Sequence, residues 1–398
     1  MTLIFERPVQ PGKPATHAFV IGVGTYPDAK PGKGFNKDLR AVPDLASAAD
    51  SAKRMCDWLL ENKDNLDAPL ATLEVLIGPA QHAAGATPYA WANEPAAPPD
   101  PPTVANVEAA GADWLGQLQK RPGDVAFFYA CGHGARLGTD PLLFLQDINT
   151  RKMHPWGGFL NVGETANAFK QVTEISAGFF FLDACQEFSP KLELSKAKWV
   201  AQFIAPLDPF QPQLTREKVF MLSATSAGLK AYDGPCADNP NLRLGRFTQT
   251  LCLALDGAAV RSRLGRWVVQ PASIIEDIIY LHGLRTDWRE DELPFEPTQS
   301  AFPTGPFPIV APARPIVPIV VFTNPAPAIS NYDLSIFASP DRAPPVVDQR
   351  PLRAQTEWLA WVPASRDMHV AVAADNGISY EAKFSPDMPI FDQRILIP

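Results

Sequence analysis

Short apolar runs alternate with amphipathic stretches over the first 300 residues of the chain. The runs are rich in branched and aromatic side chains and are bounded by turn-forming residues, which is typical of buried parallel strands; they lie at 18–24, 72–77, 124–130, 177–183 and 218–223. The intervening stretches carry apolar side chains at helical spacing; they lie at 45–60, 103–119, 161–172, 247–255 and 273–284. This alternation predicts an α/β fold with helices on both faces of a mostly parallel sheet.

The pattern changes after about residue 300. Short strand-like runs follow one another without helical periodicity, at 316–322, 333–337, 358–362 and 369–373. We therefore expect two domains, one over 15–305 and a small, sandwich-like all-β domain over 315–398. Within the first domain, the Pro- and Ala-rich stretch 78–102 is predicted to be a flexible insertion, and 188–215 is a proline-containing connection.

Composition and charge narrow the possible functions. The chain has 398 residues, of which 46% are hydrophobic and 20% charged, the balance of a folded protein with a core. Its formal net charge of −8 argues against nonspecific nucleic-acid binding and against a polybasic membrane contact. No run of about 18 apolar residues predicts a membrane span, and the N-terminal residues lack a secretory signal. With five cysteines, these features predict a cytoplasmic protein with reduced thiols.

Two of the predicted strands lead into reactive side chains. One apolar run is followed by His133 and Gly134, and a later one by Asp183 and Cys185. Ligands of an open parallel sheet bind at the carboxyl ends of its strands, so we expect these side chains at the same edge. An imidazole can take the proton of a thiol and return it to a leaving amine. The pair therefore predicts nucleophilic catalysis by a cysteine.

The motifs around these residues resemble the caspase-like cysteine peptidases, and the bacterial metacaspase and orthocaspase branch more closely than the animal caspases. FFYACGHG resembles the strand that carries the histidine of this superfamily, and FFLDACQE the strand that carries its cysteine. The histidine precedes the cysteine by 52 residues, which is similar to the caspase spacing. Further segments resemble the family over residues 17–300; they are HAFVIGVGTY, LASAADSAKRMCDWL, SATSAGLKAY and GRFTQTLCLAL. No such resemblance covers 310–398.

The resemblance implies a caspase-like three-layer αβα fold and a thiol protease of the endopeptidase type. His133 would be the catalytic imidazole and Cys185 the nucleophile that forms a thioester with the substrate. The backbone N–H groups of Gly134 and Cys185 would bind the oxyanion, and a residue without Cβ suits that role. The family implies a role in regulated proteolysis, in cell death or in defence.

The resemblance also implies a substrate pocket. Asp183 and Asp50 would line the pocket for the residue before the scissile bond, and such a carboxylate pair favours Arg or Lys there. The backbone of the protein or peptide substrate is expected to add as a strand beside Ser223, Ala224 and Thr225. Asp183 has a structural alternative, because it could cap a neighbouring helix instead.

Two features concern the region after the cysteine. The chain reads Cys-Gln-Glu-Phe where many family members carry a glycine two or three residues on, so it departs from the family pattern in the oxyanion loop. The connection 188–215 lies where caspases are cut, and Lys191, Lys196 and Lys198 are candidate sites for a basic-specific enzyme.

Other kinds of site are poorly supported by the sequence. Cys131 and His133 have no further Cys or His close in sequence to complete a zinc site. The resemblance leaves calcium activation open, since it occurs among metacaspases, but no compact Asp-rich loop signals calcium, so no cofactor is expected. The alternative function is a catalytically silent scaffold with a caspase fold, which would bind protein partners through its C-terminal β domain. Labelling of Cys185 by a covalent thiol probe would separate the two functions.

Overall fold

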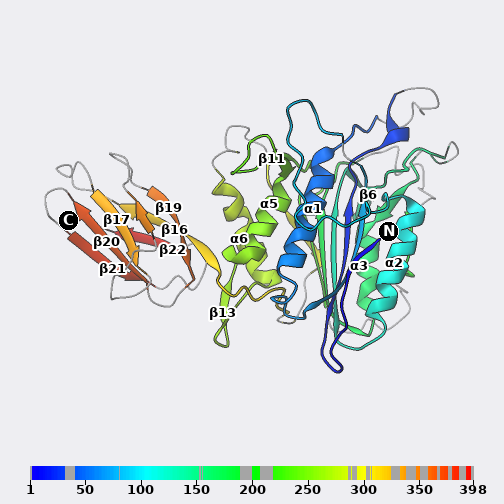
Figure 1. Ribbon diagram of the computed structural model, residues 1–398. Helices are drawn as coiled ribbons and strands as arrows, with labels where there is room; N and C mark the ends of the chain where they lie inside the picture. Colours follow the sequence, from blue (N-terminus) through cyan, green and yellow to red (C-terminus); the bar gives the residue numbers. More distant parts are fainter. Residues whose placement is uncertain are drawn as a thin grey trace. The chain divides into compact units, whose positions relative to one another are not determined.

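The computed structural model divides the chain into two compact units (Figure 1). The first unit consists of Met1–Cys252 and His282–Ile309, and the second of Leu253–Leu281 and Val310–Pro398. The domain boundaries expected from the sequence, 15–305 and 315–398, stay predictions. The structure describes residues 2–31, 41–79, 81–151, 154, 156–188, 200–206, 218–285, 288, 294–301, 305, 307–323, 332–337, 347–349, 357–364, 368–374, 379–384 and 391–395.

A seven-stranded sheet forms the centre of the first unit. Its strands follow in the order β1 (Leu3–Glu6), β3 (Leu70–Ile77), β2 (Thr16–Gly22), β4 (Asp124–Cys131), β8 (Ile175–Asp183), β10 (Val219–Ser223) and β15 (Thr298–Ala301). The pairings from β3 through to β10 are parallel, whereas the edge strands β1 and β15 are antiparallel to their neighbours. The predicted α/β fold with a mostly parallel sheet is therefore confirmed.

Helices cover both faces of this sheet (Figure 1). They are α1 (Ala46–Glu61), α2 (Val104–Leu118), α3 (Val162–Ala168) and α5 (Arg246–Leu253). Successive residues of a strand point to opposite faces. Phe127 of β4 packs on Trp58 of α1, with ring centroids 6.2 Å apart, and Phe128 packs on Trp114 of α2 at 6.1 Å. Helices α1 and α2 therefore lie on opposite faces, with the aromatic core between them.

A second, four-stranded sheet starts where β4 ends. It contains β5 (Gly134–Leu137), β6 (Asp140–Phe144), β7 (Phe159–Asn161) and β9 (Val200–Ala201), in that order. Strand β5 begins at Gly134, so only Gly132 and His133 separate the two sheets. His133 thus occupies a short junction between two hydrogen-bonded structures.

The described residues of the predicted insertion are bound to α1. The carboxylate of Asp50 accepts hydrogen bonds from His82 and from the backbone N–H of Tyr89. About two turns further along the helix, Asp57 accepts from the hydroxyl of Tyr89 and from Asn93. Two buried carboxylates of α1 therefore organise this stretch, whose flexibility stays a prediction. The candidate processing sites Lys191, Lys196 and Lys198 lie outside the described residues.

The second unit combines helical residues and strands. It contains the hairpin of β13 (Arg261–Arg263) and β14 (Arg266–Val268), followed by most of α6 (Pro271–Gly283). Its C-terminal strands are β16 (Ile316–Thr323), β17 (Tyr332–Phe337), β18 (Val347–Gln349), β19 (Glu357–Pro363), β20 (Met368–Ala374), β21 (Ser379–Phe384) and β22 (Phe391–Ile395). They pair in the orders β19-β16-β22 and β18-β17-β20-β21. A separate all-β domain stays a prediction. Within the described part of the chain, we find no helix with the length and apolar character that a bilayer crossing requires.

Candidate active site

His133 and Cys185 leave neighbouring parallel strands at the same level. Strands β4 and β8 are paired as far as Cys131 and Asp183, which lie opposite each other. His133 and Cys185 each follow two positions beyond this last pair. Between them, the N–H of Gly132 donates to the carbonyl of Asp183 at 3.3 Å, which continues the contact by one residue. The imidazole and the thiol are thus brought to the same edge of the sheet.

Hydrogen bonds from both the ring and the backbone fix the orientation of His133. Its Nε2 lies 3.0 Å from the carbonyl oxygen of Pro43. Because a carbonyl can only accept, Nε2 carries the proton, and Nδ1 is the basic nitrogen of the neutral ring. The backbone N–H of His133 donates to the hydroxyl of Tyr26 at 2.8 Å, and the two rings lie 5.2 Å apart. Burial raises the pKa of this tyrosine, so its hydroxyl stays protonated.

Cys185 is the one half-buried cysteine of the chain, since the others are buried. Its Sγ donates to the carbonyl of Ala231 at 3.7 Å. Burial raises the pKa of the thiol, and the charges of Glu187 and Asp183 raise it further, whereas Lys230 lowers it. The group therefore rests as a thiol at neutral pH, and it needs a base before it can act as a nucleophile.

Gly134 packs directly against the backbone of the cysteine segment. A Cβ at this position would lie 2.6 Å from the carbonyl oxygens of Cys185 and Leu142. Such a separation excludes any side chain, so glycine is required by close approach rather than by backbone conformation. The two N–H groups that the sequence assigns to the oxyanion thus belong to segments in direct contact.

Asp183 caps helix α5, the alternative that the sequence left open. Its carboxylate is 4% exposed, and Oδ2 accepts from the backbone N–H and the hydroxyl of Thr248, in the first turn of α5. A Cβ on Gly245 would lie 1.9 Å from this oxygen, so only glycine fits there. Burial raises the pKa of Asp183 to about 6, although the bonds from Thr248 oppose the shift.

A small cavity adjoins Asp183. It is lined by Asp183, Ala224, Lys230, Arg246, Pro294 and Phe295, among others, and its volume of about 10 Å³ holds about one water molecule. Both cations in its wall have partners. Lys230 lies 3.7 Å from the carboxylate of Glu187, and Arg246 donates to the carbonyl of Asp233 at 3.2 Å.

The carboxylates of Asp50 and Asp183 have different hydrogen-bond partners. Its carboxylate is 1% exposed and accepts from Lys53 at 3.2 Å and from His82 at 2.7 Å. The next residue of α1, Ser51, accepts from the N–H of Gly245, the glycine that packs on Asp183. The acidic side chain whose charge raises the pKa of Asp183 is Asp233. The structure therefore places Ser51, rather than Asp50, beside the glycine that covers Asp183.

The predicted substrate-binding segment lies at the end of β10. Ser223 is paired on both sides, with β8 and with Thr298 of β15. The N–H of Ala224 donates to β8, and the carbonyl of Thr225 accepts from the side chain of Gln186 at 2.5 Å. An added strand at Ser223 would have to replace β15, whereas residues 226–232, all of which the structure describes, form no strand.

Several contact residues were not singled out from the sequence. Pro43 and Ala231 act through backbone carbonyls, so their residue types carry no signal. Tyr26 acts through its hydroxyl and ends HAFVIGVGTY, a segment quoted above for its resemblance. Thr248 lies in GRFTQTLCLAL, a segment quoted above for its resemblance, and this motif could have identified it. Gln186 follows the cysteine directly and was quoted only as part of Cys-Gln-Glu-Phe, where the departure from the family pattern concerns the two positions after it.

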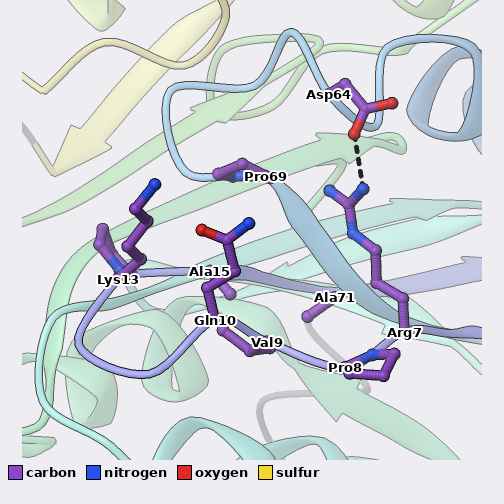
Figure 2. Close-up of a pocket in the computed structure, with 10 residues that line it drawn as sticks. Arg7, Pro8, Val9, Gln10, Lys13, Ala15, Asp64, Pro69 and Ala71 are labelled. Carbon is purple, nitrogen blue, oxygen red and sulfur yellow. Dashed lines mark hydrogen bonds and ion pairs between the residues drawn. The ribbon is translucent and has the colours of Figure 1, made fainter.

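A larger cavity of about 240 Å³ lies at the opposite edge of the sheet (Figure 2). It is lined by Arg7, Lys13, Ala15, Pro69 and neighbouring residues, next to the starts of β2 and β3. Figure 2 shows Arg7 paired with Asp64 on its rim. Because the strands are parallel, this cavity is remote from His133 and Cys185. In the described part of the chain, no three His, Cys, Asp or Glu side chains are grouped closely enough to hold a metal ion.

Comparison with known proteins places this geometry in context. The family model for the caspase domain matches residues 15–266, which is more than half of the chain and includes both His133 and Cys185. An uncharacterized protein of Sinorhizobium fredii, y4kE, is 27% identical over 218 residues. The match covers 51% of this chain and 58% of that protein, so it spans less than two thirds of the relative.

Proposed function

Because the chain belongs to the caspase domain family of peptidases, we propose that it is a cysteine endopeptidase in which His133 activates Cys185. The observation that carries the proposal is that the two residues follow the last paired residues of β4 and β8 by the same two positions. The bond from Nε2 of His133 to the carbonyl of Pro43 supports it, because that bond makes Nδ1 the basic nitrogen.

In the proposed reaction, Nδ1 of His133 takes the proton from the thiol of Cys185. The thiolate attacks the carbonyl carbon of the scissile bond, and the carbonyl oxygen becomes an oxyanion next to the N–H groups of Gly134 and Cys185. The imidazolium then gives its proton to the amine as the C–N bond breaks, which leaves a thioester on Cys185. Water, deprotonated by the same imidazole, hydrolyses the thioester and regenerates the thiol.

Substitution of the two residues tests this proposal. Cys185→Ala and His133→Ala should each lower peptide hydrolysis at least about a thousandfold, and the double variant should be little worse, because the residues act as a unit. A covalent thiol probe should label the wild type but not Cys185→Ala. Cys236→Ala, which removes a buried thiol elsewhere, serves as the matched control. Hydrolysis that persists in purified Cys185→Ala would overturn the assignment of the nucleophile, whereas a Cys185 that does not react with the probe would favour the scaffold function.

The finer part of the proposal is a preference for Arg or Lys before the scissile bond. Thr248 binds only Oδ2 of Asp183, and Oδ1 accepts no hydrogen bond from a described residue. The same side chain lines the small cavity near Cys185. Lys230 and Arg246 have their own partners, so Asp183 is the group in this wall that a basic side chain can neutralise. Because the cavity holds about one water, such a side chain requires the residues that line it to move apart.

Matched fluorogenic peptides that end in Arg, Lys, Asp or Ala test this preference. We expect kcat/KM for Arg or Lys to exceed that for Asp by at least about a hundredfold, roughly 2.7 kcal/mol. Asp183→Asn should erode the preference while the fold persists, because an amide oxygen can still accept from Thr248. If the peptide that ends in Asp is cut best, the pocket assignment is wrong, although the roles of His133 and Cys185 could stand. Regulated proteolysis is the cellular role that this activity would serve.

A further inference from the structure

We propose that Gln186, held by Arg136, is a positioning residue that keeps the thiol, the imidazole segment and the substrate-binding segment in one arrangement. The inference rests on the proposed peptidase function and deepens it. It concerns the tetrapeptide Cys-Gln-Glu-Phe, which departs from the family pattern.

The side chain of Gln186 joins two segments that come from different strands. It is 1% exposed. Its Oε1 accepts from Nη1 of Arg136 on β5 at 2.7 Å, and its Nε2 donates to the carbonyl of Thr225, beyond β10, at 2.5 Å. An amide suits this role, since its oxygen accepts and its nitrogen donates at the same end of the side chain.

The backbone of Gln186 makes two more bonds to the loop that follows Thr225. Its N–H donates to the carbonyl of Leu229 at 3.0 Å, and its carbonyl accepts from Gly228 at 2.8 Å. The same loop continues to Ala231, whose carbonyl accepts from the thiol of Cys185. The residue after the nucleophile is therefore bound to the loop that also holds the nucleophile.

Arg136 extends this connection to the imidazole. It lies three residues after His133, and its backbone N–H donates to the carbonyl of Glu187 at 3.1 Å. Its Nε donates to the carbonyl of Gly138, which fixes the direction of the guanidinium. Arg136 and Gln186 thus connect the segment of His133 with that of Cys185 on the side away from the β4–β8 ladder.

This arrangement has a mechanistic consequence. Proton transfer from a thiol to an imidazole depends steeply on their separation, and a misplacement of about 1 Å can cost roughly a hundredfold in rate. The ladder of β4 and β8 ends before His133 and Cys185, so contacts beyond it must set their separation. Gln186 makes four hydrogen bonds there. Loss of its side chain would leave the carbonyl of the buried Thr225 and Nη1 of the half-buried Arg136 without these partners.

The test compares two leucine substitutions in the full-length chain. Gln186→Leu removes the bonds to Arg136 and Thr225 at nearly constant volume. Gln249→Leu is the matched control, because the side chain of Gln249 also accepts from an arginine, Arg285, at 2.9 Å and donates to the backbone. We expect Gln186→Leu to lower kcat at least about 30-fold, and Gln249→Leu to leave kcat within about twofold, while both lower Tm. Gln186→Glu keeps the acceptor for Arg136, so its kcat should lie between that of Gln186→Leu and that of the wild type.

The outcomes separate a positioning role from a structural one. If Gln186→Leu keeps kcat within about twofold while its Tm falls as in Gln249→Leu, the inference is overturned. If Gln186→Leu does not fold, Arg136→Met takes its place, and unchanged kcat in that variant overturns the inference as well. A wild type that hydrolyses no peptide and whose Cys185 resists thiol probes refutes the proposed function instead. If the wild type hydrolyses peptides and Gln186→Leu or Arg136→Met does so at the same rate, the positioning role is refuted and the proposed function stands.

Discussion

Cys185 lies among charges of both signs, and their balance sets its reactivity. Burial is the largest cause that raises the pKa of this thiol, and the negative charges of Glu187 and Asp183 add to it. Lys230 acts in the opposite direction, and it also pairs with Glu187 at 3.7 Å. Glu187 and Lys230 are 39% and 48% exposed at the side chain, so solvent and salt screen both effects.

These opposing charges give a prediction about pH. A nearby negative charge disfavours the thiolate, so Glu187→Gln should lower the pKa of Cys185, and its alkylation by iodoacetamide should begin at a lower pH. Lys230→Gln removes a cation that stabilises the thiolate, and it should move the alkylation profile to higher pH. The measurement is the alkylation rate as a function of pH, and it reports on Cys185 because the other cysteines are buried. Both displacements should shrink in about 1 M salt; displacements of the same sign, or insensitive to salt, would contradict this account.

At the residue scale, the sequence predicts the reactive side chains better than it predicts what holds them. His133 and Cys185 stand out because their residue types follow apolar runs. Their partners are the carbonyls of Pro43 and Ala231, and every residue has a carbonyl. The identity of such a partner depends on the path of the chain in space, which no pattern of residue types encodes.

At the element scale, the strands and helices around the site are well predicted. The run 177–183 corresponds to β8 (Ile175–Asp183), because a strand buried on both faces is apolar along its whole length. The predicted helix 103–119 corresponds to α2 (Val104–Leu118), and Thr103 caps it, since its side chain accepts from the N–H of Asn106. Strand β1 (Leu3–Glu6) was not predicted, since four residues at an edge form too short a pattern.

The cap of α5 shows why the rest of the site could not be predicted. An N-cap is normally sought just before the helix, but Oδ2 of Asp183 accepts from Thr248, 65 residues further along the chain. Asp50 illustrates the same limit on α1. Periodicity places it on the helix, but neighbouring positions point about 100° apart. The partners are therefore decided by tertiary packing, which directs Ser51 to Gly245 and Asp50 to His82.

At the scale of the whole molecule, the chain divides into units that do not follow its linear order. Residues 253–281 belong with the C-terminal strands, and His282–Ile309 return to the unit that contains His133 and Cys185. Gly257 lies within the second unit, with φ of 127°, and a Cβ there would lie 2.8 Å from Pro315. This close approach ties the segment that follows α5 to the start of the C-terminal strands, inside the same unit.

Gly257→Ala should therefore destabilise the second unit and spare the chemistry of the first. The substitution forces a residue with a side chain into a conformation that costs roughly 1–3 kcal/mol, and it adds a clash with the backbone of Pro315. Gly265→Ala is the matched control, because φ is also positive there, at 80°, but nothing lies within 4 Å of the added Cβ. In calorimetry of the full chain, Gly257→Ala should lower the midpoint of one transition by more than Gly265→Ala does, while the alkylation rate of Cys185 at 25 °C stays that of the wild type. Equal losses in the two variants would show that the contact with Pro315 contributes nothing. If the midpoints of both transitions fall together and the alkylation of Cys185 changes, the two units unfold as one. The reason is that only a shared cooperative structure carries a local strain in one unit to the thiol of the other.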